Sequence, residues 1–238
     1  PMPEGFSHVE RGNLSSLQSS TDETTAAIHL EPIQGEGGVW PSSKEFISGA
    51  EKHARDNSLL FMVDEVQSGL CRTGEWFAYQ HYNVEPDVIC IAKALGNGFP
   101  IGACMTTKKV GDCMGHGTHG STFGGNPLAC TVANSVLDIL DENFMSSLQA
   151  VSENFQSDLI KITKDYPNIV SAIKGRGLML GLKCVIENVK FVEKARENKL
   201  LTIKAADNVV RLLPPLNISE KDCNEAIDKI RNTCKYLT

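Results

Sequence analysis

Lys93 stands where a lysine can act as a nucleophile. It follows the apolar residues 88–92 and precedes a turn that contains Gly96, Gly98 and Gly102. The apolar residues predict a buried strand, and a charged amine at the end of such a strand is costly to desolvate. Desolvation favours the neutral amine, which attacks carbonyl groups. An ordinary surface lysine at a strand end is the competing interpretation.

A carboxylate, Asp64, follows a second apolar run at residues 59–63. If the two runs are neighbouring strands, Asp64 and Lys93 lie at one edge of one sheet. Pyridoxal phosphate (PLP) chemistry requires such a pair, since the amine bonds to the cofactor and the carboxylate keeps its pyridine nitrogen protonated. Val66 and Gln67 follow, and they are placed to pack on the ring and to hydrogen-bond its phenolic oxygen. A turn or helix-cap aspartate is the alternative for Asp64.

Three further polar residues could bind anions. Ser121 and Thr122 stand just before a predicted helix start at Pro127, and a hydroxyl beside free backbone N–H groups can bind phosphate. An ordinary Ser/Thr cap before a proline is the alternative. Arg211 interrupts an apolar strand pattern and therefore needs a partner. A substrate carboxylate held by two hydrogen bonds would supply one. A protein ion pair is the alternative, and Glu36 is the candidate for it.

The bulk composition narrows the classes of function. The chain has 238 residues, of which 41% are hydrophobic and 22% charged, and its net charge is −6. The acidic balance argues against nucleic-acid binding, and no apolar run is long enough for a membrane span. The eight cysteines form no Cys-x-x-Cys pair, and His116 and His119 lack a third ligand, so we expect no metal site. Reduced cysteines in apolar patterns favour a cytoplasmic location.

Strands and helices alternate in the first part of the chain, which predicts an α/β fold with a mostly parallel sheet. The pattern changes near residue 141, so we expect part of a large domain over residues 1–141 and a smaller α+β domain over residues 142–238. In the first part we predict strands at 25–30, 59–63, 88–92 and 101–106 and helices at 42–57 and 127–140, the last with Leu128, Val132, Val136 and Ile139 on one apolar face. In the second part we predict helices at 143–166, 189–198 and 219–236 and strands at 169–173, 178–185, 200–203 and 209–213.

Taken together, these motifs resemble the class III (subgroup II) PLP-dependent aminotransferases. The resemblance extends over essentially the whole chain, and the ordered set of motifs is highly specific. It implies fold type I of the PLP-dependent transferases, with PLP as cofactor. The matching segments are EPIQGEGG at 31–38, VDEVQSG at 63–69, RTG at 72–74, AKALGNGFPIGA at 92–103, GSTFGGNPLA at 120–129 and GRGLMLG at 175–181.

The resemblance implies a cofactor role for one group of residues. Lys93 would bind PLP covalently and later carry a proton between substrate and cofactor. Asp64 would pair with the pyridinium nitrogen, and the cofactor site would be completed by Glu65, Val66 and Gln67.

A second group would serve the substrate and a neighbouring subunit. Thr122 would reach the phosphate of the partner's cofactor, which implies a homodimer with shared active sites. Ser121 would lie near the bound substrate. Arg211 would hold a substrate carboxylate, with Glu36 as the gate that covers it.

Within the family, residues 120–130 and 208–215 are most similar to members that take the amino group of N-acetylornithine. This similarity implies transfer of that group to 2-oxoglutarate, which becomes glutamate, in arginine biosynthesis. Ornithine, succinylornithine and 4-aminobutyrate are alternative donors, because the motifs do not separate them. An inactive fragment that binds PLP weakly is the alternative from another class.

Two departures from the family pattern stand out. Cys71 occupies a position where the family usually has glycine, and we expect this change to be tolerated. The family also has a long stretch before the position of Pro1, with a phosphate loop, a ring-stacking aromatic and another substrate-binding arginine. We therefore expect this chain to be the C-terminal portion of a longer enzyme, and to bind PLP poorly and transaminate little by itself.

Overall fold

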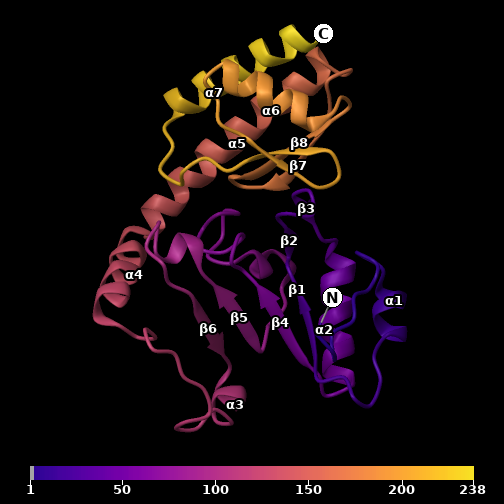
Figure 1. Ribbon diagram of the computed structural model, residues 1–238, viewed down its shortest axis with the longest axis vertical. Helices are drawn as coiled ribbons and strands as arrows, with labels where there is room; N and C mark the ends of the chain where they lie inside the picture. Colours follow the sequence, from indigo (N-terminus) through magenta and orange to yellow (C-terminus); the bar gives the residue numbers. More distant parts are fainter. Residues whose placement is uncertain (1–2) are drawn as a thin grey trace.

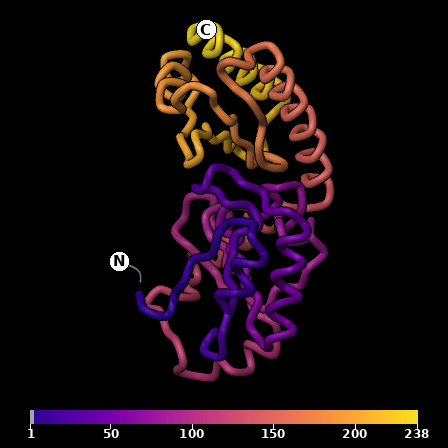
Figure 2. The backbone as a smooth tube through the Cα atoms, turned by 90° about the vertical axis from the view of Figure 1, so that its right-hand side faces the viewer, coloured from indigo at the N-terminus to yellow at the C-terminus, as the bar shows by residue number. Residues whose placement is uncertain are grey.

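The computed structural model describes residues 3–238 and has two lobes (Figure 1). The lower lobe contains the N-terminal part of the chain and one four-stranded sheet. The upper lobe contains a second four-stranded sheet with α6 and α7 on one side of it. The long helix α5, Glu142–Asp165, begins beside the lower lobe and runs along the upper one (Figure 2).

The lower sheet is mostly parallel, as predicted. Its strands, in the order β1-β4-β5-β6, are Ala27–Leu30, Leu60–Asp64, Val88–Ile91 and Ala103–Thr106. The first three run parallel to one another, and β6 pairs with β5 in the antiparallel sense. The carboxyl ends of β1, β4 and β5 therefore meet at one edge.

Helix α2, Lys44–Asp56, packs against this sheet through residues at helical spacing. The Ser43 hydroxyl caps its first turn by accepting the N–H of Phe46 at 3.1 Å. The buried face of the helix and the two strands it covers form one hydrophobic cluster, which fixes β4 and so the position of Asp64. The cluster includes Phe46, Ile47, Ala50 and Ala54 of α2, Ile28 of β1, and Phe61 and Val63 of β4.

Most other elements of the lower lobe are short. They are α1 Leu14–Ser19, β2 Ile33–Gln34, β3 Trp40–Pro41, the 3₁₀ helices η1 Ala78–Tyr82 and η2 Lys93–Leu95, α3 Lys108–Gly111, and the longer α4 Pro127–Ile139.

The apolar face of α4 that the sequence pattern defines is only partly buried, with Val136 packed against the main hydrophobic cluster. Leu128 is 63% exposed and Ile139 is 61% exposed, whereas Ala129 and Ala133 are buried. The two alanines let the helix approach η2 closely, so small side chains rather than large apolar ones decide which face packs inward.

The upper sheet is antiparallel throughout, in the order β7-β8-β10-β9. Helix α7 begins after Ser219, whose hydroxyl accepts the N–H of Asp222 at 3.1 Å. The elements are β7 Val170–Arg176, β8 Met179–Cys184, α6 Asn188–Glu197, β9 Ile203–Ala205, β10 Val209–Leu212 and α7 Glu220–Leu237.

The strand that we predicted at 200–203 is wrong in position, because β9 runs from Ile203 to Ala205. The preceding residues terminate helix α6 instead. Lys199 has a positive φ of 58°, and the N–H of Leu200 donates to the carbonyl of Ala195 at 2.8 Å. Strand pairing therefore begins only at Ile203, opposite Arg211.

The two lobes share contacts that cross residue 141. The Arg72 guanidinium of the lower lobe donates to the carbonyls of Leu178 at 3.2 Å and Pro214 at 2.6 Å in the upper lobe. Burial lowers the pKa of Arg72 to about 10. One hydrophobic cluster also contains Leu95 of the lower lobe and Leu180 of the upper lobe. The division into domains at residue 141 stays a prediction.

Cys71 occupies a backbone conformation that suits glycine, the residue that the resemblance leads us to expect at this position. Its φ is 66°, in the left-handed region, which costs a residue with a Cβ roughly 1–2 kcal/mol. The side chain is fully buried in the main hydrophobic cluster, so packing offsets part of that cost.

We expect Gly177→Ala to destabilise the contact between the lobes. Gly177 has a φ of 58°, and a Cβ there would lie 2.6 Å from the carbonyl carbon of Thr73. The strained backbone and the clash together should lower the free energy of unfolding by about 2–5 kcal/mol, as measured by urea denaturation. Gly117→Ala is the control, since its φ is 82° but nothing lies within 4 Å. Equal losses in the two variants would contradict the proposed contact.

Candidate active site

Three neighbouring strands each end in an ionisable residue at the same edge of the lower sheet. Glu31 follows β1, Asp64 is the last residue of β4, and Lys93 follows β5 by two residues. Asp64 is opposite Cys90 in the parallel register. The expectation that two neighbouring strands bring Asp64 and Lys93 to one edge is confirmed.

Lys93 is held in an uncommon backbone conformation. Its φ is 46°, a region that bulky residues rarely adopt and that clusters at functional sites. Its carbonyl accepts the N–H groups of Gly96 and Asn97, both at 3.1 Å. The side chain is exposed, so the desolvation that we expected from the apolar strand is not provided by this chain. The apolar residues end with the strand, and Lys93 itself lies beyond them.

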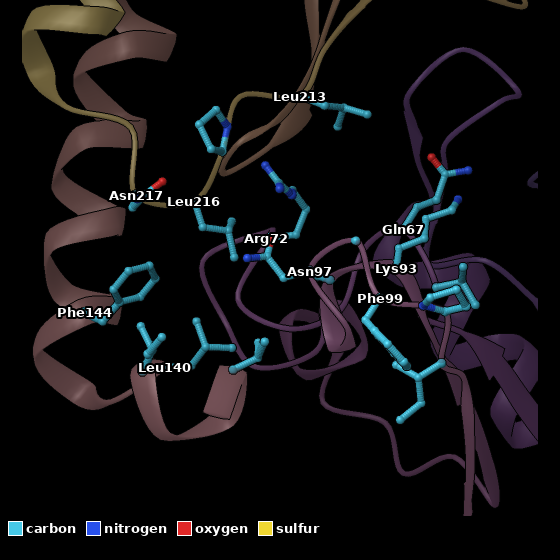
Figure 3. A pocket seen from close by; sticks show the side chains of 18 residues that line it. Gln67, Arg72, Lys93, Asn97, Phe99, Leu140, Phe144, Leu213, Leu216 and Asn217 are labelled. Carbon is cyan, nitrogen blue, oxygen red and sulfur yellow. The ribbon is translucent and has the colours of Figure 1, made fainter. Parts of the chain in front are cut away.

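A cavity of about 670 Å³ opens beside Lys93, in the size range of small-molecule sites. Figure 3 shows Lys93 and Gln67 on one side, Leu140 and Phe144 on the other, and Arg72 between them. Residues of both lobes line it. Asp64 lines a second cavity of about 340 Å³, together with Glu31, whose carboxylate is influenced by the charges of both Asp64 and Lys93.

Asp64 and Glu65 have different surroundings. One oxygen of Asp64 accepts the N–H of Val66 at 2.9 Å, which fixes the carboxylate at the strand end. Glu65 is 1% exposed, and its oxygens accept from the Ser68 hydroxyl at 2.5 Å and the Tyr79 N–H at 2.8 Å. Burial raises the pKa of Glu65. The sequence grouped Glu65 with the cofactor ligands, but its carboxylate is turned into the protein and serves to hold the turn.

Arg211 is brought to the site from β10 of the upper lobe. Its side chain is 7% exposed and donates to Glu36 at 2.7 Å and to the Gln67 amide oxygen at 3.0 Å. Its Nε finds no hydrogen-bond partner within residues 3–238. The protein ion pair that we gave as the alternative for Arg211 is therefore present. The Nε–H is itself buried, so a ligand carboxylate would have to replace Glu36 at the guanidinium.

Glu36 is an exposed side chain on a fixed backbone. Its side chain is 71% exposed, while its carbonyl accepts the N–H of Ala206 at 3.0 Å. The hydrogen bond from Arg211 lowers the pKa of Glu36. Gln67 lies at 3.5 Å from Glu36, so the glutamine amide belongs to this polar group in the structure.

Ser121 and Thr122 are not brought to the cavity beside Lys93. Both are exposed, in the segment that leads into α4. The Ser121 carbonyl accepts the N–H of Gly124 at 3.2 Å, which is a local turn. Their predicted role toward a neighbouring subunit stays a prediction.

Glu31 is a site residue that the sequence reasoning did not single out. Its carboxylate accepts the N–H of Gly35 at 3.0 Å. Burial, followed by the negative charge of Asp64, raises the pKa of Glu31, while Lys93 and the Gly35 N–H act in the opposite direction. Glu31 therefore lies in the combined field of Asp64 and Lys93. The sequence pattern that selected Asp64, an ionisable residue directly after an apolar strand, also applies to Glu31.

Two observations concern other classes of site. Across residues 3–238, no three His, Cys, Asp or Glu side chains gather closely enough to hold a metal ion. Over the same described range, no helix combines the length and hydropathy needed to cross a membrane.

The chain belongs to the class III aminotransferases. Residues 6–234 match the model of the family described as "Aminotransferase class-III". Members of this family depend on PLP and have fold type I. The resemblance, the α/β fold class and the cofactor inferred from the sequence are therefore confirmed.

Similar proteins carry several substrate names. An acetylornithine aminotransferase of Brucella melitensis is 43% identical over 239 residues, covering 100% of this chain and 59% of that protein. A succinylornithine transaminase of Yersinia pseudotuberculosis is 39% identical over 249 residues, with the same two coverages of 100% and 59%. The ornithine aminotransferase of Toxoplasma gondii ME49 superposes with a TM-score of 0.93 at 34% identity, covering 100% of this chain and 58% of that one. This chain thus spans about three fifths of its relatives' length.

We expect Glu36→Gln to strengthen binding of a small dicarboxylate such as 2-oxoglutarate. The wild-type carboxylate competes for the Arg211 guanidinium, and a charge-assisted hydrogen bond is worth roughly 1.5–3 kcal/mol. Removing the charge should tighten the dissociation constant about tenfold, as measured by titration calorimetry.

Glu197→Gln is the matched control. It removes an exposed charge that pairs with Lys194 on α6 and not with Arg211, and should leave affinity unchanged. Unaltered affinity in Glu36→Gln would remove Glu36 as a competitor for ligand carboxylates.

Proposed function

We propose that this chain carries the lysine-bearing part of an aminotransferase site. The enzyme uses PLP to move the amino group of N-acetylornithine, or a similar ω-amino donor, to 2-oxoglutarate, giving glutamate in arginine biosynthesis. The observation that carries the proposal is the meeting of Lys93 and Asp64 at the ends of adjacent parallel strands. The names of the similar proteins support the choice of donor.

The residues at this edge fit the cofactor. The Lys93 amine opens on a cavity of about 670 Å³, and Asp64 is a fixed carboxylate for a cationic ring nitrogen. Gly35 has no side chain, which leaves room for the Gln67 amide at this edge. A Cβ on residue 35 would lie 2.4 Å from the Gln67 amide oxygen. When bound, PLP supplies an electron sink for the bond broken at the substrate's Cα.

The chain's own residues do the rest of the work. Lys93 would hold the cofactor, and its amine, once free, would carry the proton that leaves the substrate's Cα. Asp64 would hold a proton on the ring nitrogen by its negative charge. Arg211 orients a substrate carboxylate once Glu36 withdraws. Apolar residues such as Phe99 and Ile101 line the cavity and limit access of water.

The arrangement of subunits and the location are part of the same proposal. Ser121 and Thr122 serve the active site of a second copy in a homodimer, and their exposure supports this role. The enzyme acts in the cytoplasm, and its eight unpaired cysteines support a reducing compartment. Succinylornithine and ornithine remain alternative donors, since relatives with those names match the whole chain. 4-Aminobutyrate is the further alternative.

We expect borohydride to fix PLP to Lys93. The polypeptide that carries this chain is incubated with saturating PLP, reduced and digested, and the modified peptide is identified by mass spectrometry. Lys93, which lines the cavity, should be labelled in preference to a surface lysine such as Lys108, and Lys93→Ala should lose this label. Label distributed over surface lysines in the wild type would contradict both the assignment of Lys93 and the proposed site.

We expect Asp64→Asn to impair amine transfer far more than cofactor binding. Loss of the charge lets the ring nitrogen deprotonate, which weakens the electron sink by an amount on the order of several kcal/mol in a buried site. Turnover with N-acetylornithine and 2-oxoglutarate is measured beside PLP affinity, in the polypeptide that carries this chain. Asp112→Asn, at an exposed pair with Lys108, is the control. Near-normal turnover in Asp64→Asn would refute the assignment.

A further inference from the structure

Two cysteines are direct neighbours across the strand pair that leads into and away from Lys93. Cys90 of β5 lies opposite Cys104 of β6 in the antiparallel register, and Figure 1 shows the two strands side by side. Because side chains of opposed residues project from the same face of a sheet, the two thiols face each other. Neither the aminotransferase chemistry nor any role given above uses them.

The hydrogen bonds show which kind of cross-strand pair this is. The Thr107 N–H donates to the Asp87 carbonyl at 3.0 Å, so residues 87 and 107 form a hydrogen-bonded pair. Pair types alternate along an antiparallel ladder, which makes Cys90 and Cys104, three steps on, a non-hydrogen-bonded pair. In agreement, the Cys90 carbonyl points to the other neighbour, β4, where it accepts the N–H of Glu65 at 2.9 Å.

That pair type suits a disulfide. Its Cα atoms are about 4.5 Å apart, the closer of the two spacings, and disulfides span Cα separations of about 4.4–6.8 Å. The bond can therefore form without movement of the strands. Burial and then the neighbouring Cys104 thiol raise the pKa of Cys90, as expected for a thiol that faces another across the strand pair.

The remaining cysteines differ from this pair. Cys104 is exposed and Cys90 half-buried, so an oxidant can reach the first and the second can resolve the product. Cys113 and Cys130 are exposed as well, but neither lies opposite another cysteine in a strand pair. The other four cysteines are buried.

We propose that Cys90 and Cys104 form a redox site, which peroxide converts into an intramolecular disulfide and low-molecular-weight thiols restore. The Cys104 thiolate attacks one oxygen of hydrogen peroxide, giving a sulfenic acid and, after protonation of the leaving hydroxide, one water. The Cys90 sulfur then attacks the sulfenic sulfur, the S–O bond breaks, and the proton of Cys90 leaves with the hydroxide as a second water. The two thiols lose two electrons in all, and the peroxide gains them.

The new bond encloses the segment that carries the nucleophile. Residues 91–103 lie between the two cysteines, and they include Lys93, η2 and the glycine turn up to Gly102. Oxidation therefore ties the two ends of the Lys93 loop together, while it protects both sulfurs from irreversible oxidation. Cytoplasmic disulfides of this type are typically transient and redox-sensing.

The test oxidises the 238-residue chain with hydrogen peroxide and blocks the remaining thiols with an alkylating reagent. Digestion and mass spectrometry then locate each cysteine. We expect a peptide that joins Cys90 to Cys104, lighter by two hydrogen atoms than the two reduced peptides, and its loss on treatment with dithiothreitol. Cys113→Ser and Cys130→Ser are matched controls at exposed, unopposed cysteines, and both should keep the joined peptide.

Cys90→Ser supplies the second arm of the test. Without its resolving partner, Cys104 should accumulate as sulfinic or sulfonic acid several-fold faster than in the wild type. The proposal is overturned if the oxidised wild type contains no joined peptide, or if Cys104 is over-oxidised at the same rate with and without Cys90. Circular dichroism of each variant, taken before oxidation, shows that the compared chains are folded.

Discussion

The site depends on one property of parallel strands, which is that their carboxyl ends all face the same way. β1, β4 and β5 are held in register by α2 and the cluster around Phe61. Their ends therefore present Glu31, Asp64 and Lys93 along one edge without any contact between the three side chains being needed. If β5 ran antiparallel to β4, the amine and the carboxylate would lie at opposite ends of the strands, a full strand length apart.

The upper lobe adds the cationic side of the site. Arg211 is a buried cation on β10, and isolated buried charge is costly. Glu36 and Gln67 of the lower lobe satisfy part of it, so the most polar contact of the site also joins the two lobes. Arg72 makes a second connection through backbone carbonyls. Because different lobes supply the amine and the arginine, the position of a bound substrate depends on how the lobes pack.

Sequence reasoning located what depends on short-range pattern. Apolar runs followed by Asp64 and Lys93 identified the strand ends, and alternation of strands and helices identified the parallel sheet. It could not show that Lys93 is exposed, because exposure depends on how neighbouring elements pack around the strand end. Nor could periodicity reveal that alanines make the buried face of α4, since that choice depends on how closely η2 approaches. Glu31 was overlooked although the rule that selected Asp64 applies to it as well.

The backbone anchor of Glu36 sets the timescale on which the site can change its electrostatic state. Since the Ala206 N–H fixes the carbonyl of Glu36 while the carboxylate is largely exposed, the carboxylate can leave Arg211 by rotation of a single side chain. Rotamer changes of exposed residues take picoseconds to nanoseconds, whereas domain motions take microseconds to milliseconds. The Arg211 guanidinium can thus exchange the Glu36 carboxylate for a ligand carboxylate far faster than either lobe can move. A ligand with a second carboxylate therefore meets Arg211 without Glu36, and a ligand lacking one meets Arg211 paired with Glu36, in the same rigid framework.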